Sequence, residues 1–244
     1  MTEKKELRQN LQSVEGQISA AARQAERKPD EIQLVVVTKK HPVETLQSLI
    51  EIGVKNLGES YAQEGRAKIE SLRASGTELA NVQWHMIGHV QSRKASTVVQ
   101  HFDILHSLDS LKLASRINRI AKEQDRVLPV LLEVNISGEA SKHGFPASEE
   151  GAWPELLPLV EEIAQLANLR IKGLMSMAAI VADGAEARPY FERTRQLRDR
   201  LAERFSDEDW SQLSMGMSSD FEAAILEGAT IVRVGSKILG PRPS

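Results

Sequence analysis

Lys39 stands directly after residues 34–38, an apolar, β-branched run with the composition of a strand buried on both faces. Lysine is rarely buried without a chemical task, and a desolvated amine becomes nucleophilic toward a carbonyl group. The alternative is that Lys39 and the adjacent Lys40 simply point into solvent. Neighbouring strand side chains point to opposite faces, so only one of the two lysines can face the interior. Both faces of this run are apolar, and alternation alone leaves that choice open.

Two turns rich in glycine and serine lie near the C-terminus, at residues 214–220 and 233–240. In the second turn, Gly235 and then Ser236 open a short predicted helix, which presents backbone N–H groups and a positive dipole end to an anion. A phosphate group fits that chemistry. Together with a nucleophilic lysine, it predicts a ligand that carries both an aldehyde and a phosphate. Pyridoxal 5′-phosphate (PLP) has both, and would form a Schiff base with the lysine.

Other polar residues at predicted strand ends have less specific interpretations. His85 and His89 raise the question of a metal, but no carboxylate or third histidine lies at ligand spacing, so we expect rim or core positions and no metal site. Lys142 and His143 belong to a charged, glycine-containing loop that is either simply mobile or gates a substrate. Met175 is more typical of core filling than of ligand contact.

The elements that would position these residues alternate regularly along the chain. Short apolar runs predict strands, and apolar residues at helical spacing predict helices between them. The predicted strands are 34–38, 54–57, 82–87, 104–107, 127–135, 169–174, 212–215 and 231–234. The predicted helices are 5–27, 42–52, 62–72, 92–99, 109–121 (capped by Asp109), 154–167, 188–205 and 220–226, with a last turn ending at 240–241.

This alternation predicts an α/β fold, a single (β/α)8 TIM-type barrel over residues 1–244 with an extra leading helix within residues 1–28. The glycine–serine turns then follow the last two strands, where barrels commonly bind phosphate. An open doubly wound sheet is the alternative, and the absence of G-x-G-x-x-G after the first strand disfavours it.

Composition excludes several classes of protein. The chain has 244 residues, 31 Lys+Arg against 34 Asp+Glu, a net charge of −3 and no cysteine. Without cysteine it has no disulfide, no thiol nucleophile and no cysteine-bound iron–sulfur cluster. Its nearly balanced charge lacks the excess of basic residues with which proteins bind nucleic acid over a broad surface. The apolar runs are too short to cross a bilayer, and the charged start lacks a signal core. We expect a cytoplasmic protein that binds neither nucleic acid nor membrane.

Nine segments, spread over nearly the whole chain, resemble the pyridoxal phosphate homeostasis proteins. They are residues 36–39, 57–64, 84–88, 91–94, 135–137, 141–144, 173–175, 214–218 and 233–235. That family is similar in fold to the barrel domain of bacterial alanine racemase, holds PLP on a lysine after the first strand, and has no established catalytic turnover. The resemblance implies cofactor contacts from Lys39 (Schiff base, an aldimine), Ser218, Gly235 and Ser236 (phosphate) and Arg233 (near the pyridine ring), with Ser60, His85, Met175 and Lys142 as further candidates.

The sequence departs from the family pattern at three places. Thr38 replaces the usual serine and keeps a hydroxyl group, Lys40-His41 stands where Thr-Lys is common, and Ser60 replaces a common asparagine. The second departure places another amine beside Lys39. The third bears on a family contact to the cofactor or its surroundings.

Three functions remain open at this stage. The leading one is a non-catalytic carrier that buffers PLP or delivers it to apo forms of PLP-dependent enzymes. The alternative is a racemase-type enzyme; such racemases resemble a barrel fused to a β-domain that brings a tyrosine base, and we expect no room for that domain here. The two tyrosines are Tyr61 and Tyr190, and a cationic Arg233 beside the pyridine would weaken the electron sink. The third function is a sugar-phosphate-binding barrel in which Lys39 is merely solvated.

Overall fold

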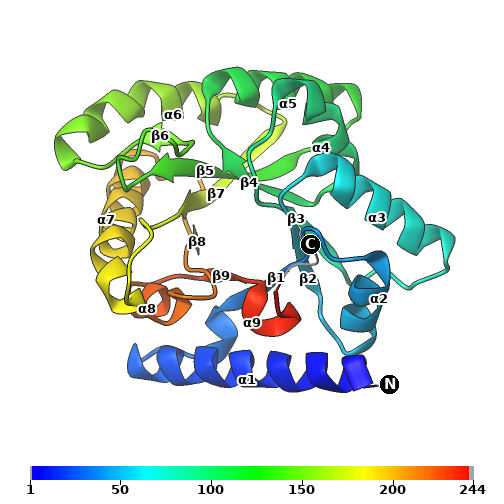
Figure 1. Ribbon diagram of the computed structural model, residues 1–244. Coiled ribbons are helices and arrows are strands. Elements are labelled where there is room, and N and C mark those ends of the chain that lie inside the picture. The colour runs from blue at the N-terminus through cyan, green and yellow to red at the C-terminus, as the bar shows by residue number, and fades with distance from the viewer. Residues whose placement is uncertain (1, 242–244) are drawn as a thin grey trace.

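Eight parallel strands form a closed ring with helices packed around the outside (Figure 1). This computed structural model describes residues 2–241. In order around the ring, the strands are β1 (Gln33–Val37), β2 (Asn56–Glu59), β3 (Gln83–Met86), β4 (Ile104–Leu108), β5 (Leu128–Asn135), β7 (Leu169–Ser176), β8 (Gln212–Ser214) and β9 (Ile231–Val234). The ring closes because β9 pairs with β1, and β4 pairs with β5. The predicted (β/α)8 barrel is confirmed.

Helices follow the strands and cover the ring on its outer side. They are α1 (Thr2–Gln24), α2 (Val43–Glu51), α3 (Ala62–Ala74), α4 (Ala95–His101), α5 (Leu111–Glu123), α6 (Leu157–Ala164), α7 (Arg188–Arg204), α8 (Phe221–Leu226) and α9 (Ser236–Leu239). The leading helix α1 packs against α2, α8 and α9, as Figure 1 shows. Among the described residues, no helix has the length and apolarity needed to cross a bilayer.

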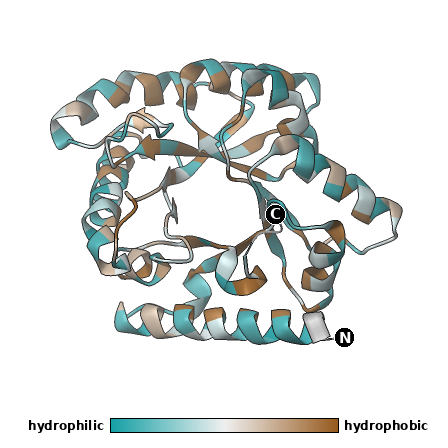
Figure 2. Cartoon of the chain, in the orientation of Figure 1, coloured by the Kyte–Doolittle hydropathy of each residue, from teal (hydrophilic) through white to brown (hydrophobic). Residues whose placement is uncertain are grey.

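The apolar core has two parts, one on each side of the strands. The larger part lies between strands and helices, and Figure 2 shows brown strands facing helices that carry both brown and teal residues. The smaller part lies inside the ring, where strands from opposite sides contribute Val35, Ile104, Leu131, Met175 and Ile231. Because side chains alternate along a strand, this inner cluster identifies which residues of β1, β4, β5, β7 and β9 face the interior.

A ninth strand, β6 (Phe145–Pro146), was not predicted from the sequence. It pairs with the end of β5, Val134 opposite Phe145, while the other edge of Val134 pairs with β7. β6 thus occupies the edge of β5 beyond the last residue that pairs with β4. Its two residues are too few to produce a periodic pattern in the sequence, but they hold the loop after β5 against the barrel mouth.

The second strand was predicted two residues too early, at 54–57 instead of 56–59. Val54 is apolar but still belongs to the end of α2, since its N–H bonds to the carbonyl of Leu49. The N–H of Gly53, which has φ of +102°, bonds to the carbonyl of Ile50. These two bonds form a Schellman motif that ends the helix and delays the strand.

Three helix starts also differ from the prediction. Ser110, rather than Asp109, caps α5, because its hydroxyl accepts a bond from the N–H of Leu113. The predicted helices at 92–99 and 154–167 each begin as a 3₁₀ turn, Ser92–Lys94 before α4 and Glu150–Leu156 before α6. Tighter first turns of this kind are common at helix N-termini and leave the hydrophobic pattern almost unchanged.

Gly173 of β7 should not tolerate any side chain. Its φ is +139°, and an added Cβ would lie 1.8 Å from the carbonyl oxygen of Gln212 in β8. We predict that Gly173→Ala lowers the free energy of unfolding by about 2 kcal/mol or more, from strain and overpacking. The matched control is Gly16→Ala in α1, where nothing lies within 4 Å and the same change should stabilise the helix by up to about 1 kcal/mol. Urea unfolding measures both, and equal midpoints for the two variants would contradict the prediction.

Candidate functional site

Lys39 lies in the turn that follows β1, at the mouth of the barrel formed by the C-terminal ends of the strands. The inner cluster contains Val35, so the alternation of β1 directs Val37, and then Lys39, toward the interior side. Lys39 lines a cavity of about 530 Å³ that is enclosed by the loops after β1, β2 and β3, together with Glu133, His143 and Met177. An amine at this position can reach a ligand held in the barrel mouth.

Lys40 points elsewhere. It is exposed and has a left-handed backbone, with φ of +65°, so the chain turns sharply between the two lysines. Its N–H donates to Glu64 Oε1 at 2.5 Å, which ties the turn to α3 on the outside of the barrel. Lys40 does not line the cavity of Lys39. Tertiary structure thus resolves the choice between the two lysines that strand alternation left open.

A buried polar network behind Lys39 holds this turn in place. Thr38 donates its hydroxyl to Glu59 Oε1 at 2.7 Å. The ammonium of Lys68, on α3, donates to the same oxygen at 2.8 Å and to the carbonyl of Thr38 at 2.8 Å. Burial raises the pKa of Glu59, and the Lys68 charge opposes that rise. The network joins β1, β2 and α3, so the residue before Lys39 has little freedom to move.

The two glycine–serine turns lie side by side at the ends of β8 and β9. The N–H of Gly235 donates to Ser218 Oγ at 3.3 Å, which connects the two turns. A Cβ added to Gly235 would lie 3.1 Å from the carbonyl oxygen of Val37, so this turn passes close to the end of β1. Ser236 begins α9, whose first N–H groups have no partner within the helix. These predicted phosphate contacts do not line the Lys39 cavity, although they share the same end of the barrel.

Arg233 is almost completely buried inside the ring, with 4% of its surface exposed. It donates Nη1–H to Ser214 Oγ at 2.7 Å and Nη2–H to the carbonyl of Ser176 at 2.9 Å. Burial lowers the pKa of Arg233 to about 10, while Asp220 and Glu133 act in the opposite direction. The guanidinium therefore stays charged at neutral pH, and its position is set by β7 and β8.

A chain of hydrogen bonds continues from Arg233 through the barrel. Ser214 Oγ bonds to His106 Nδ1 at 2.8 Å, and His106 Nε2 bonds to His85 Nδ1 at 2.9 Å. Burial lowers the pKa of His85 to about 4 and that of His106 well below its usual value, so both rings are neutral. His85 therefore has a core position, one of the two interpretations that its sequence context allowed. The two rings are hydrogen-bonded to one another.

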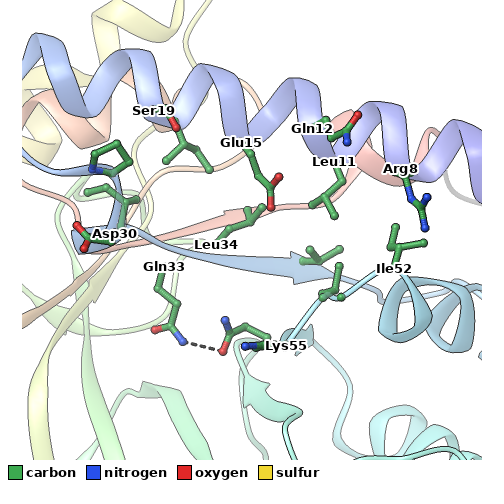
Figure 3. Close-up of a pocket in the computed structure, with 17 residues that line it drawn as sticks. Arg8, Leu11, Gln12, Glu15, Ser19, Asp30, Gln33, Leu34, Ile52 and Lys55 are labelled. Atoms are coloured by element: carbon green, nitrogen blue, oxygen red, sulfur yellow. Dashed lines mark hydrogen bonds between the residues drawn. The ribbon is translucent and has the colours of Figure 1, made fainter.

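This chain of hydrogen bonds ends at the opposite face of the barrel, where the strands begin. His85 Nε2 lies 3.4 Å from Asn56 Oδ1, which also accepts a bond of 2.7 Å from Gln33. Both amide side chains line a groove of about 570 Å³ between α1 and the starts of β1 and β2, and Figure 3 shows the bond from Gln33 there. This groove is larger than the Lys39 cavity, but the described structure brings neither Lys39 nor the glycine–serine turns to it.

Glu133 of β5 is a buried carboxylate that lines the Lys39 cavity. Its Oε2 atom has no hydrogen-bond partner. Burial raises the pKa of Glu133 to about 7; Asp109 adds to that rise and Arg233 opposes it. No role was predicted for it from the sequence, although a single acidic residue within an apolar strand was a visible signal. His106, Ser176 and Ser214 were missed for another reason, since each is an ordinary residue type whose partners lie far away in the sequence.

Of the remaining candidate cofactor contacts, Ser60, Met175 and Lys142, only the first lies at the Lys39 cavity. Ser60 lines the Lys39 cavity, and so does Tyr61 beside it. Met175 packs in the apolar cluster inside the ring. Lys142 is tied within its own loop and to the next one, since its ammonium donates to Glu139 at 2.7 Å and to the carbonyl of Ala178 at 2.8 Å. The structure thus brings Ser60 to the cavity but not Met175 or Lys142.

Comparison with known proteins identifies the family. The sequence profile described as "Alanine racemase, N-terminal domain" matches residues 9–243. The pyridoxal phosphate homeostasis protein of Escherichia coli (strain K12) is 39% identical over 236 residues, which cover 96% of this chain and 95% of that protein. This chain belongs to the pyridoxal phosphate homeostasis protein family. The resemblance noted from the sequence is confirmed.

Solved structures of relatives agree with the fold. PipY of Synechococcus elongatus PCC7942, determined with PLP bound, is 32% identical, has a TM-score of 0.79, and is matched over 96% of this chain and 100% of that one. An alanine racemase of Clostridium difficile 630 is 19% identical with a TM-score of 0.67, covering 98% of this chain and 58% of that chain. The second similarity concerns the fold alone.

Glu133 should make stability depend on pH in a definite direction. Its pKa is about 7 in the folded protein against an ordinary 4.5, so the folded state binds more protons between these values, and stability falls as pH rises through them. We predict that Glu133→Gln removes this fall. The ligand-free variant should be more stable than the parent by up to about 3 kcal/mol at pH 8, with the gain shrinking toward pH 4.5.

Urea unfolding at a series of pH values measures this difference. Glu162→Gln is a suitable control, because Glu162 is an exposed carboxylate on α6, outside the barrel mouth. A gain for Glu133→Gln that is the same at every pH would show that Glu133 does not titrate in this range.

Proposed function

We propose that this chain binds PLP covalently through Lys39 and serves in PLP homeostasis, buffering the cofactor or delivering it to apo PLP-dependent enzymes without strong catalytic turnover. The observation that carries the proposal is the position of Lys39: it lies at the mouth of the barrel, beside a cavity, in a chain similar over its length to proteins named for PLP homeostasis. PipY, whose structure has been solved with PLP bound, supports the same ligand.

The residues present fit the cofactor at its two ends. Lys39 offers an amine on the cavity side, and the neighbouring turns offer Ser218, Gly235 and Ser236 to a phosphate group. Gly235 leaves room where a side chain would press on the carbonyl of Val37, so backbone N–H groups can approach an anion closely. When bound, PLP supplies an aldehyde that condenses reversibly with an amine and a ring that withdraws electrons.

Arg233 favours a carrier over a racemase-type enzyme. A guanidinium that stays charged at neutral pH, placed near the pyridine ring as the family resemblance implies, disfavours protonation of the ring nitrogen. The unprotonated ring is a weaker electron sink, which disfavours removal of a proton from an amino acid bound to the cofactor. Because Ser214 and the carbonyl of Ser176 hold the guanidinium, Arg233 has little freedom to turn away.

Lys39 should be the residue that carries the cofactor. The purified protein loaded with PLP should be yellow, and borohydride reduction followed by peptide mass mapping should locate the label on Lys39. Lys39→Ala should lose both the colour and the label, while Lys40→Ala, the matched control on the exposed side of the turn, should keep both.

A label on Lys40, or a yellow Lys39→Ala protein with no label moved to a neighbouring lysine, would overturn the assignment. Robust racemisation in a sensitive assay with a panel of amino acids would overturn the carrier role while leaving the Lys39 attachment intact. The two parts of the proposal are therefore tested separately.

Gly235 should matter only for ligands that carry a phosphate. Gly235→Val blocks backbone approach to the anion, and each charge-assisted hydrogen bond lost would cost about 1.5–3 kcal/mol, roughly a tenfold to hundredfold loss of affinity for PLP. Affinity for pyridoxal, which lacks the phosphate, should change little and serves as the internal control. Equal affinity for PLP in the folded variant and the parent would remove these turns from the site.

A further inference from the structure

His89, Asp109 and His143 come together at the mouth of the barrel, beside the Lys39 cavity. Each offers one atom that can bind a metal, and these three atoms lie within 4.8 Å of one another. The residues are 20 and 34 positions apart along the chain, and so the sequence showed no ligand spacing. The expectation of a rim position for His89 holds, but the fold supplies the carboxylate and the further histidine that are missing from its sequence neighbourhood.

Three successive loops contribute the three side chains. His89 follows β3, Asp109 follows β4, and His143 lies in the loop after β5. In a closed parallel barrel, the loops after neighbouring strands meet at one face, where barrel enzymes place their functional groups. The convergence of three donor side chains follows from the order of the strands in the ring.

Hydrogen bonds and close packing constrain the loops that carry the three donors. The carbonyl of Gly88, next to His89, accepts a bond of 2.6 Å from the Ser107 hydroxyl, and Asp109 Oδ1 accepts one of 3.0 Å from Ser110. His143 directly precedes Gly144, which packs against the β5 backbone with φ of +112°, and β6 then pairs with β5. The donors therefore need only side-chain rotations to adjust their positions.

Present contacts already join the three groups. His89 Nδ1 lies 2.7 Å from Asp109 Oδ2, which is a hydrogen-bond distance. Two ligand atoms on one tetrahedral zinc ion lie roughly 3.3 Å apart, so this pair needs to separate by only a few tenths of an ångström to bind the ion. The rings of His89 and His143 stack with centroids 3.8 Å apart and planes inclined by 10°. A metal lies in the plane of each imidazole that binds it, so at least one ring must turn out of the stack. Both histidines are exposed, which leaves room for that rotation.

We propose that His89, Asp109 and His143 form a site for a divalent transition metal, with zinc as the best match. Two imidazoles and one carboxylate suit zinc and its neighbours, whereas magnesium and calcium prefer oxygen ligands only. Three protein ligands leave a coordination position for water or for a ligand in the cavity, which His89 and His143 both line. A bound ion would link the loops after β3, β4 and β5 across the mouth of the cavity.

The test uses the full-length chain without a histidine tag, after dialysis against a chelator. Zn²⁺ is titrated by calorimetry, and Co²⁺ by its visible absorption, which reports coordination geometry. We expect one equivalent to bind, with affinity reduced at least tenfold in His143→Gln and in Asp109→Asn. His101→Gln, which removes a histidine on α4, is the matched control and should bind like the parent.

A second control separates this site from the proposed cofactor site. Lys39→Ala should still bind one equivalent, because Lys39 is not one of the three metal ligands, and any metal held only through bound PLP would be lost there. Histidine ring signals in NMR spectra should shift on addition of Zn²⁺ for His89 and His143. Failure of the parent to bind, or equal affinity in the parent, His143→Gln and Asp109→Asn, would overturn the metal site and show that the histidines only stack.

Discussion

The interior of this barrel depends on the hydrogen bonds of one buried charged group, the guanidinium of Arg233. A charge enclosed by eight strands must form hydrogen bonds with the protein. The desolvation free energy of an isolated buried ion is far larger than the net free energy of unfolding of a domain. Ser214 and the carbonyl of Ser176 accept these hydrogen bonds from Arg233, and Ser214 bonds in turn to His106 and then His85. Two neutral histidines thus fill space that aliphatic side chains occupy in many barrels, and they connect the mouth to the opposite face.

The same need for paired polar groups sets the geometry around Lys39. Glu59 is fully buried, and one of its carboxylate oxygens, Oε1, accepts from both Lys68 and the hydroxyl of Thr38. Breaking such a buried pair would leave an uncompensated charge, which is strongly destabilising. The network therefore fixes Thr38 on the outer side of the ring and leaves the next residue on the cavity side. Lys39 thereby gains a defined position at the cavity without being buried itself.

The two candidate sites at the barrel mouth are formed by loops that the strand order brings together. The turns after β8 and β9 lie beside the end of β1, while the loops after β3, β4 and β5 meet across the cavity. The groove under α1 is larger, yet it lies at the face where barrels keep stabilising contacts and not chemistry. In a barrel, the end of the strands on which a cavity opens is a better guide to function than the size of the cavity.

The sequence alone determined the alternation of strands and helices, the family, and the residue types at the strand ends, because these depend on local composition and spacing. It could not decide which face of β1 is interior, since both are apolar, and the inner cluster containing Val35 decided that. Nor could it show that His89, Asp109 and His143 meet, or that Glu133 is buried without a partner for one oxygen. Those facts exist only once the ring closes, because closure brings residues from separate loops within bonding distance and excludes water from between the strands.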